Sequence, residues 1–188
     1  ECQRPEMKAS GFRDVDYVLT TRELGRMMRE AGIDIRDMPE EGADDILGDY
    51  TGAATIFGAT GGVMEAALRS AYFLVTGHEL ENVEVAPVRG LKGTKEAEID
   101  IEGTKIKVAV AHSCGQARAL LEKVQGQLES TGESEYQFIE VMACPGGCVG
   151  GGGQSWGSNM AKRARRGESL YAEDKSLPLR RSHENPSI

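Results

Sequence analysis

A strand–helix–strand pattern between residues 105 and 143 constrains the fold of this chain more than any other feature. The run KIKVAVAHS (105–113) is β-branched and apolar, GQARALLEKVQGQLEST (115–131) is typical of a helix, and YQFIEVMA (136–143) is typical of a buried strand. Strands that alternate with helices are the pattern of α/β proteins. The sequence therefore predicts an α/β fold, a layered and largely parallel sheet with flanking helices and one antiparallel addition.

Further elements follow from local patterns. Strands are predicted over VDYVLTT (15–21), VEVAPV (83–88) and EAEIDI (96–101). Helices are predicted over 21–32, from about Gly61 to a stop at Gly77, and from Ser158 to about Asp174. The second of these helices is expected to bury Val63, Ala67, Leu68, Ala71 and Leu74. The acidic stretch after residue 32 is expected to be a surface loop, and no domain boundary is indicated.

The net charge argues against a nucleic-acid partner, and the length of the apolar run argues against a membrane span. The formal net charge is −8, whereas nucleic-acid binding needs a clustered basic surface. The basic run KRARRG (162–167) is interpreted as a solvated helix face. The apolar run at 66–75 is interrupted by Arg69 and is too short for a bilayer. We therefore expect no nucleic-acid partner and no membrane span.

The segment EVMACPGGCVGGGGQSWG (140–157) carries the strongest chemical signal. Cys144 and Cys148 follow a predicted strand, and open α/β sheets place ligand sites at that end of their strands. Thiolates suit zinc, copper(I) or iron–sulfur clusters. No second cysteine pair or paired histidines follow, as a structural zinc site would need, and a disulfide across so short a loop would stabilise little. An iron–sulfur cluster fits better, because glycine amides can reach cluster sulfides without a Cβ in the way.

A cubane cluster takes about four protein thiolates, and this loop supplies two. The others would come from Cys2 and Cys114 or from chain that is absent. The histidines, which are His78, His112 and His183, are not spaced as ligand pairs and are expected to be ordinary surface or core residues.

A second glycine-rich segment, TIFGATGGVMEAALRSA (55–71), precedes a predicted helix. Such glycines form an anion-binding nest in some proteins and allow close packing of a helix in others. No Gly-Lys-Ser/Thr follows, so the segment is not a P-loop. By itself the segment leaves both interpretations open.

Two motifs together closely resemble the catalytic domain of [FeFe]-hydrogenases: FGATGGVMEAALR (57–69) and EVMACPGGCVGGGGQ (140–154). The opening ECQRPEM is similar to the continuation of that family's motif M-P-C-x-x-K-x-x-E, with Glu1 as its closing glutamate. LYAEDKSLPLRRSHENPSI (170–188) resembles the family's C-terminal stretch. The resemblance implies that residues 1–188 are the C-terminal part of the H-cluster domain, truncated at both ends.

The resemblance also implies roles for single residues. Cys144 and Cys148 match metal ligands of a [4Fe-4S] cluster, and Cys148 also matches the bridge to a diiron subcluster with CO, CN and dithiolate ligands. Catalytic positions are matched by Cys148, Met142 and Glu1, and cofactor-pocket positions by Phe57, Gly58, Thr60, Gly61 and Gly147. The helix beginning at Gly61 is then expected to aim its positive end at the anionic cofactor.

The activity that the resemblance implies is the reversible reduction of protons to H2, with a ferredoxin-type or other redox partner, in the cytoplasm or periplasm. The family's T-S-C-C-P motif and the M-P-C-x-x-K portion are missing here, so this chain alone is expected to be inactive. Cys2 and Cys114 match no family ligand and are expected to be free, small hydrophobic residues. One alternative is a hydrogenase-like iron–sulfur assembly or scaffold protein resembling the prelamin A recognition factor. Another is a sensory hydrogenase.

Overall fold

The computed structural model describes residues 3–42, 48–82 and 84–187. The chain divides into two compact units, a smaller one of residues 1–43 with 153–157 and a larger one of residues 44–152 with 158–188. The sequence indicated no such boundary.

The smaller unit is organised around helix α1 (Thr21–Glu30). Thr20 caps this helix: its hydroxyl accepts from the Glu23 amide at 3.3 Å, and the Glu23 carboxylate accepts from the Thr20 amide at 2.7 Å. The strand expected over 15–21 is wrong, because residues 15–20 lead into this capping box without strand pairing. A Thr followed three residues later by Glu is the signature of such a start.

The segment 153–157 of the same unit is held to α1 by Arg22. The Arg22 amide donates to the Gly153 carbonyl at 3.2 Å, and the guanidinium donates to the Gln154 carbonyl at 3.2 Å. The guanidinium also lies 4.1 Å from the ring centre of Trp156. A short 3₁₀ turn, η1 (Ile35–Asp37), lies in the expected surface loop.

The larger unit contains a three-stranded sheet of β1 (Thr94–Ile101), β2 (Thr104–His112) and β3 (Phe138–Met142), in the order β1-β2-β3. β1 and β2 form an antiparallel hairpin. β2 and β3 are parallel and are connected through α4 (Cys114–Thr131). The expected α/β class with flanking helices is confirmed, and the sheet is mixed, with one parallel and one antiparallel pairing.

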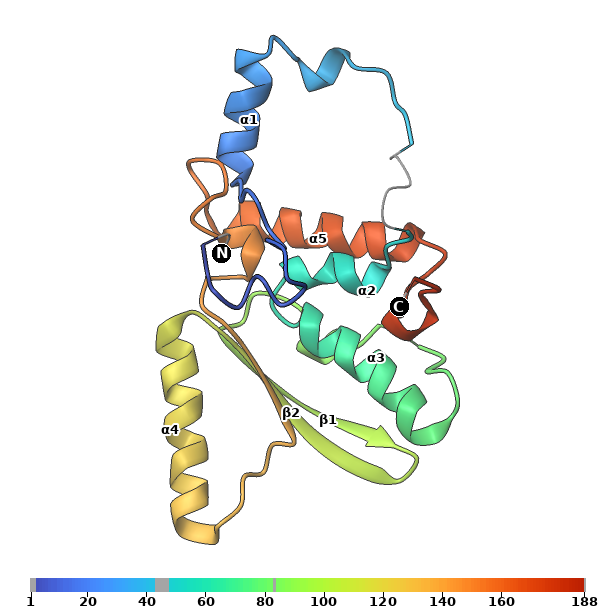
Figure 1. The fold of residues 1–188 in the computed structure, drawn as a ribbon. Helices are drawn as coiled ribbons and strands as arrows, with labels where there is room; N and C mark the ends of the chain where they lie inside the picture. Colours follow the sequence, from blue (N-terminus) through green and yellow to red (C-terminus); the bar gives the residue numbers. More distant parts are fainter. Residues whose placement is uncertain (1–2, 43–47, 83, 188) are drawn as a thin grey trace. The chain divides into compact units, whose positions relative to one another are not determined.

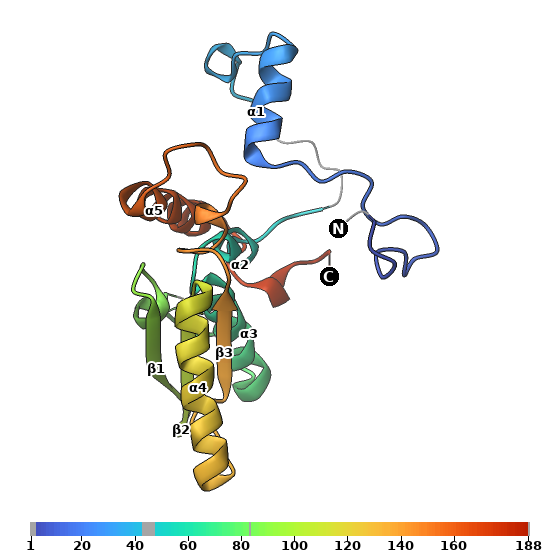
Figure 2. The same ribbon diagram turned by 90° about the vertical axis from the view of Figure 1, so that its left-hand side faces the viewer.

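Helices cover both faces of this sheet. Val108 and Val110 of β2 pack in a cluster with Met64 and Leu68 of α3 (Gly62–Thr76). The alternate residues of β2, Ala109 and Ala111, pack with Leu120 of α4. α3 and α4 therefore lie on opposite faces (Figures 1 and 2). A central strand buried on both faces shows a continuous buried run, and residues 108–112 of β2 are all buried.

Two expectations about this unit are corrected. Residues 86–88 form a 3₁₀ turn, η3 (Ala86–Val88), where a strand was expected, and Pro87 has no amide to donate to a sheet. Residue 83 lies outside the described residues. α3 ends at Gly77 as expected, but its buried face differs: Leu74 is 76% exposed, whereas Glu65 and Arg69 are fully buried. Apolar periodicity misplaced this face because the helix packs around a buried ion pair.

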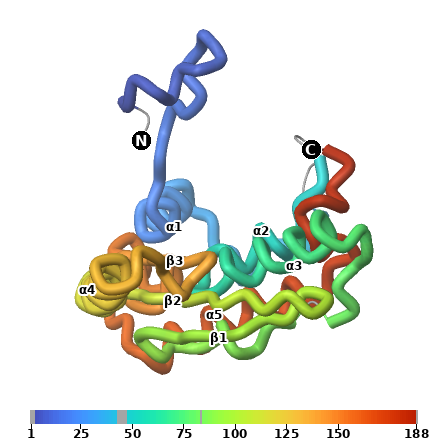
Figure 3. The backbone as a smooth tube through the Cα atoms, turned by 90° about the horizontal axis from the view of Figure 1, so that it is seen from below, coloured from blue at the N-terminus to red at the C-terminus, as the bar shows by residue number. Residues whose placement is uncertain are grey.

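The last helix, α5 (Met160–Ser176), packs against α2 (Gly52–Thr55) and the 3₁₀ turn η2 (Ile56–Gly58). After α5, the C-terminal segment returns beside α3 through the 3₁₀ turn η5 (Ser182–Glu184) (Figure 3). In the part of the chain that the structure describes, no helix combines the length and apolar character needed to cross a bilayer.

Candidate functional site

The two cysteines lie in a tight loop that leaves the end of β3. The Gly147 amide donates to the Cys144 carbonyl at 3.0 Å, and Gly146 and Gly147 have φ values of 86° and 93°. Cys148 then begins the 3₁₀ turn η4 (Cys148–Gly150). The Cys144 side chain is half-buried and free, and Cys148 is exposed. In the described part of the chain, Cys144 and Cys148 are not joined by a disulfide.

The turn that precedes α3 packs directly on the cysteine loop. The Thr60 amide donates to the Gly146 carbonyl at 3.0 Å. A Cβ placed on Gly147 would lie 2.7 Å from the Thr60 nitrogen, 2.9 Å from the Gly58 oxygen and 2.9 Å from the Met142 sulfur. Thus the fold brings Gly58, Thr60, Met142 and Gly147 together at the cysteine loop, and their roles around a cofactor stay a prediction.

The other predicted site residues have different surroundings. Phe57 is 45% exposed, one position before Gly58. Gly61 is buried with φ +92°, and a Cβ there would lie 1.9 Å from the Val88 carbonyl oxygen. Glu1 and Cys2 lie outside the described residues. Cys114 is exposed at the start of α4, so the expectation that it packs as a small hydrophobic residue is wrong.

The N-terminus of α3 already has an anionic partner within the protein. The buried carboxylate of Glu140, on β3, accepts from the Gly61 amide at 2.6 Å and from the Met64 amide at 2.7 Å. A helix N-terminus stabilises negative charge through its free amides and its dipole. The Glu140 carboxylate thus caps this helix from within the protein, and the expectation that the same end also faces an anionic cofactor stays a prediction. The sequence carried one indication of this contact, because Glu140 is a lone acidic residue inside the apolar strand FIEVM (138–142).

A buried lysine supports the same turn from the sheet. The Lys95 ammonium donates to the Thr60 carbonyl at 3.1 Å and to the Gly90 carbonyl at 2.9 Å. Burial lowers the pKa of Lys95 to about 8, and the nearby charge of Glu140 opposes this shift in part. Lys95 and Glu140 thus hold the Thr60–Gly61 turn from two sides with opposite charges.

His112, at the end of β2, positions the cysteine loop. The Gly146 amide donates to its Nδ1 at 3.2 Å, and its Nε2 lies 3.1 Å from the Leu91 carbonyl oxygen. Because Nδ1 accepts, Nε2 carries the hydrogen and donates to Leu91. This is a buried core histidine with both ring nitrogens satisfied, in line with the expectation of an ordinary core residue.

The basic run on α5 is only partly the solvated face that was expected. Lys162 and Arg165 are exposed, but Arg163 and Arg166 are half-buried. Arg166 donates from Nη1 to the Val149 carbonyl at 2.8 Å and so fixes the end of the cysteine loop. Arg163 lines a cavity of about 510 Å³, together with Thr60, Gly146, Val149 and Tyr171. A charge run in the sequence could not reveal that two of its members face inward.

The chemistry of the loop fits part of an iron–sulfur centre. Two thiol side chains stand on a glycine-rich backbone whose close contacts leave no room for a Cβ at Gly147. Among the residues that the structure describes, no group of three or more His, Cys, Asp or Glu side chains is placed to hold a metal. The loop carries two thiols, Cys144 and Cys148, whereas a cubane takes about four.

Comparison with known proteins identifies the family. The family model described as "Iron only hydrogenase large subunit, C-terminal domain" matches residues 1–152, and the model described as "Iron hydrogenase small subunit" matches residues 160–188. The chain therefore belongs to the iron-only hydrogenase family, as the two sequence motifs indicated.

Individual relatives agree with this assignment. The NADP-reducing hydrogenase subunit HndD of Solidesulfovibrio fructosivorans is 48% identical over 100% of this chain and 31% of its own length. The periplasmic [Fe] hydrogenase large subunit of Nitratidesulfovibrio vulgaris is 52% identical over 80% of this chain and 35% of its own length. At lower identity, the mouse cytosolic iron-sulfur assembly component 3 is 31% identical over 82% of the chain and 32% of its own length. The chain spans about a third of the length of these relatives.

Solved structures share the fold. The [FeFe]-hydrogenase HydA(deltaEFG) matches with a TM-score of 0.73 at 39% identity, over 100% of this chain and 53% of that one. A variant of the [FeFe]-hydrogenase HydA1 from Chlamydomonas reinhardtii matches with a TM-score of 0.69 at 40% identity, over 94% of this chain and 50% of that one.

Proposed function

We propose that this chain is part of an [FeFe]-hydrogenase that catalyses the reversible reduction of protons to H2. The observation that carries the proposal is the packing of the Cys144–Cys148 loop on Gly58, Thr60 and Met142, in a chain of this family. These are the positions at which the resemblance expects an H-cluster, a [4Fe-4S] cluster joined to a diiron subcluster.

The residues of this chain would hold and shape the centre. Cys144 and Cys148 supply two thiolate ligands, and Cys148 is also the proposed bridge. Gly147 lets the loop approach the Gly58–Thr60 turn, and Glu140, Lys95 and His112 fix that turn and loop from behind. When bound, the cofactor supplies the redox chemistry, while the protein orients and shields it. Glu1, by resemblance, remains a proposed contributor to the polar contacts around the centre.

The first test uses the longer polypeptide that contains this chain. Infrared spectroscopy of the loaded protein is expected to show bands of metal-bound CO and CN. A Cys148→Ala variant is expected to lose these bands together with H2 evolution, whereas Cys114→Ala, at an exposed position outside the loop, is expected to keep both. Survival of the bands in the Cys148→Ala protein would contradict the ligand assignment.

The second test concerns the 188-residue chain by itself. Because a cubane takes about four thiolates and two are placed here, we propose that the rest of the same domain supplies the others. Reconstitution of this chain with iron and sulfide is therefore expected to give no H2 evolution. Robust activity from these 188 residues would contradict the proposal that the remaining ligands lie elsewhere.

The redox partner and location are proposals of the same kind. We propose a ferredoxin-type electron partner and a cytoplasmic location, and we note that one relative is named as periplasmic. A second candidate function, iron–sulfur cluster assembly, is favoured by the 31% identity to cytosolic iron-sulfur assembly component 3. The same infrared measurement separates the two, because a scaffold without a diiron site would show no CO or CN bands, while its iron–sulfur cluster would still absorb visible light.

A further inference from the structure

A cavity of about 510 Å³ lies against the cysteine loop in the larger unit. Its walls come from the turn at residues 59–60, the stretch 89–91 after η3, the cysteine loop at Gly146 and Val149, and α5 between residues 163 and 171. Neither Cys144 nor Cys148 lines this cavity. It is therefore separate from the two thiols that are proposed to hold a cluster.

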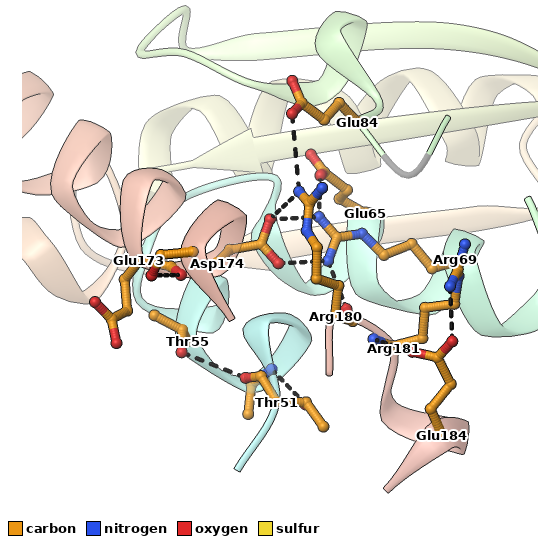
Figure 4. Close-up of polar contacts among 12 residues, drawn as sticks. Thr51, Thr55, Glu65, Arg69, Glu84, Glu173, Asp174, Arg180, Arg181 and Glu184 are labelled. Atoms are coloured by element: carbon orange, nitrogen blue, oxygen red, sulfur yellow. Dashed lines mark hydrogen bonds and ion pairs between the residues drawn. The ribbon is translucent and has the colours of Figure 1, made fainter. Parts of the chain in front are cut away.

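Two arginines line the cavity, and the charge of the first is compensated within the protein. Arg89 donates to both carboxylate oxygens of Glu65, at 2.8 Å and 2.7 Å, and to Glu84 at 3.3 Å. Glu65 also accepts from the buried Arg69 at 2.6 Å, and Arg69 donates to Asp174 at 2.8 Å. Glu65, Arg69 and Asp174 form the Arg69–Asp174 cluster (Figure 4). Arg89 thus has carboxylate partners of its own and offers little charge to a ligand.

Arg163, the second arginine, keeps its positive charge uncompensated. Its Nη1 donates to the Met160 sulfur at 3.4 Å, a weak acceptor, and no described carboxylate forms an ion pair with it. Its Nε is buried and has no hydrogen-bond partner among the described residues. The side chain packs on the cysteine loop, since a Cβ on Gly146 would lie 3.6 Å from the Arg163 Cβ and one on Gly150 would lie 2.9 Å from the Arg163 Nε. Glu168 also lines the cavity but is exposed, so solvent screens its charge.

The hydroxyl of Tyr171 is a second unpaired donor at the cavity. Its oxygen is buried and has no hydrogen-bond partner among the residues that the structure describes. The ring is held in place by the Arg89 guanidinium, whose carbon lies 4.2 Å from the ring centre. Burial and the nearby charge of Glu65 raise the pKa of Tyr171. The hydroxyl therefore keeps its proton at neutral pH and can donate it to an acceptor.

The spacing of these two donors sets the size of a ligand that meets both. Arg163 and Tyr171 lie eight positions apart on α5, so about two turns, or ~12 Å along the helix axis, separate their backbones. Between them the walls are apolar, with Leu91, Val149 and Ala164 among the lining residues. Sites for small molecules are typically apolar cavities of about 300–1,000 Å³ with a few placed polar groups, and this cavity has that composition.

We propose that this cavity binds a short-chain organic carboxylate that carries a second hydrogen-bond acceptor, as a keto acid does. The Arg163 guanidinium holds the carboxylate, because its planar set of N–H donors matches the two carboxylate oxygens. The Tyr171 hydroxyl donates to the second acceptor, and the apolar walls contact the carbon chain. A half-buried cation and a buried hydroxyl thereby gain the partners that they lack within the described part of the chain.

The experiment is isothermal titration calorimetry of the metal-free longer polypeptide that contains this chain, with three probes of similar size. Levulinate has both a carboxylate and a keto group, valerate lacks the keto group, and methyl propyl ketone lacks the carboxylate. Levulinate is expected to bind most tightly. Valerate is expected to bind about 3–10-fold more weakly, because it loses one hydrogen bond, and the ketone roughly 10-fold or more, because it loses the charged pair.

Substitutions assign each end of the ligand to a side chain. Arg163→Met is expected to weaken the binding of levulinate and of valerate by roughly 10-fold or more. Its matched control is Arg165→Met, which removes the same charge from an exposed position of the same helix and should leave both affinities unchanged. Tyr171→Phe is expected to weaken levulinate binding about 3–10-fold and to leave valerate binding unchanged, because valerate has no acceptor for the hydroxyl.

A further variant keeps the test decisive if Arg163→Met fails to fold, as circular dichroism would show. Ala164→Leu fills the cavity without removing a charge and is expected to abolish levulinate binding, whereas Ala161→Leu, at an exposed position of α5, should retain it. The proposal would be overturned by absence of levulinate binding to the wild type, by equal affinity in the folded Arg163→Met or Ala164→Leu protein, or by sulfate binding as tightly as levulinate. The titrations use metal-free protein, so none of these outcomes bears on the H2 proposal.

Discussion

Two regions of the larger unit join segments that are far apart in the sequence, and they do so by different means. At the cysteine loop the contacts run through backbone, with Thr60 bonding Gly146 and Gly147 pressed against Gly58 and Thr60. At the Arg69–Asp174 cluster they run through charged side chains buried to 0% exposure. The loop therefore tolerates no added atoms, whereas the cluster tolerates no lost charge.

Helix α3 takes part in both regions, and a buried charge fixes it in each. At its N-terminus the Glu140 carboxylate meets backbone amides. Further along, Arg69 meets two carboxylates, Glu65 and Asp174. Since each of these charges is compensated by a partner from another segment, removal of one partner leaves an unpaired charge in the interior. Substitutions in the cysteine loop and in the Arg69–Asp174 cluster are expected to lower stability to different extents.

The largest effect is expected for Arg69→Met. Removing one member of a buried ion pair leaves the others uncompensated and typically costs about 3–5 kcal/mol. Urea denaturation should show this loss in the free energy of unfolding. Arg118→Met is the matched control, because Arg118 is 81% exposed in its pair with Glu122 and should change stability by less than ~1 kcal/mol. Equal losses in the free energy of unfolding for the two variants would show that burial of the ion pair does not increase its contribution to stability.

The next largest loss of stability is expected for Gly147→Ala. Its φ of 93° and ψ of −162° suit glycine, and its new methyl group would meet backbone atoms of Thr60 and Gly58. Backbone strain of this kind costs roughly 1–3 kcal/mol, and the displaced loop should also lower iron binding in the longer polypeptide. Gly152→Ala, in the same loop with open space around it, should keep both stability and iron content. If it behaves like Gly147→Ala, the close approach is not the cause.

A loss of stability of about the same size is expected for Glu140→Gln. The neutral amide retains one acceptor oxygen for two amides, so a charge-assisted bond worth about 1.5–3 kcal/mol is weakened or lost. Hydrogen exchange at the Gly61 and Met64 amides should speed up in this variant. Glu133→Gln, at an exposed position, should leave both amides protected. Unchanged exchange in Glu140→Gln would contradict the assignment of this carboxylate as the cap of α3.

The smallest effect is a pH dependence from Lys95. Its pKa is lowered to about 8 from 10.5, so between these values the unfolded chain binds more protons than the folded one. The free energy of unfolding should therefore rise with pH across this window, by at most ~1.4 kcal/mol per pH unit from this group. Urea denaturation of wild type and Lys95→Met at several pH values isolates the contribution, because the two proteins differ only at this side chain. Identical slopes in the two proteins would show that Lys95 stays charged at little cost.

Much of the architecture was predictable because it depends on patterns within short segments. The alternation of β2, α4 and β3, the bounds of α3 and α5 and the cysteine loop all follow from local periodicity and from glycine placement. The family could be identified for the same reason, since its two motifs are contiguous runs of residues. The strand expected at 15–21 was wrong, although the sequence carried the local signal of the helix that begins there, the Thr20–Glu23 capping box.

Tertiary structure alone decided which charged and polar residues turn inward. Glu140, Arg69, Lys95 and His112 carry charged or polar side chains, and each is buried. A charged group is buried when a partner compensates its loss of hydration. All four of these residues find a partner many positions away: Glu140 at Gly61, Arg69 at Asp174, Lys95 at Thr60 and His112 at Gly146. The sequence by itself determined the elements and the two thiols. The fold determined what holds them in place, because only three-dimensional contact brings those partners together.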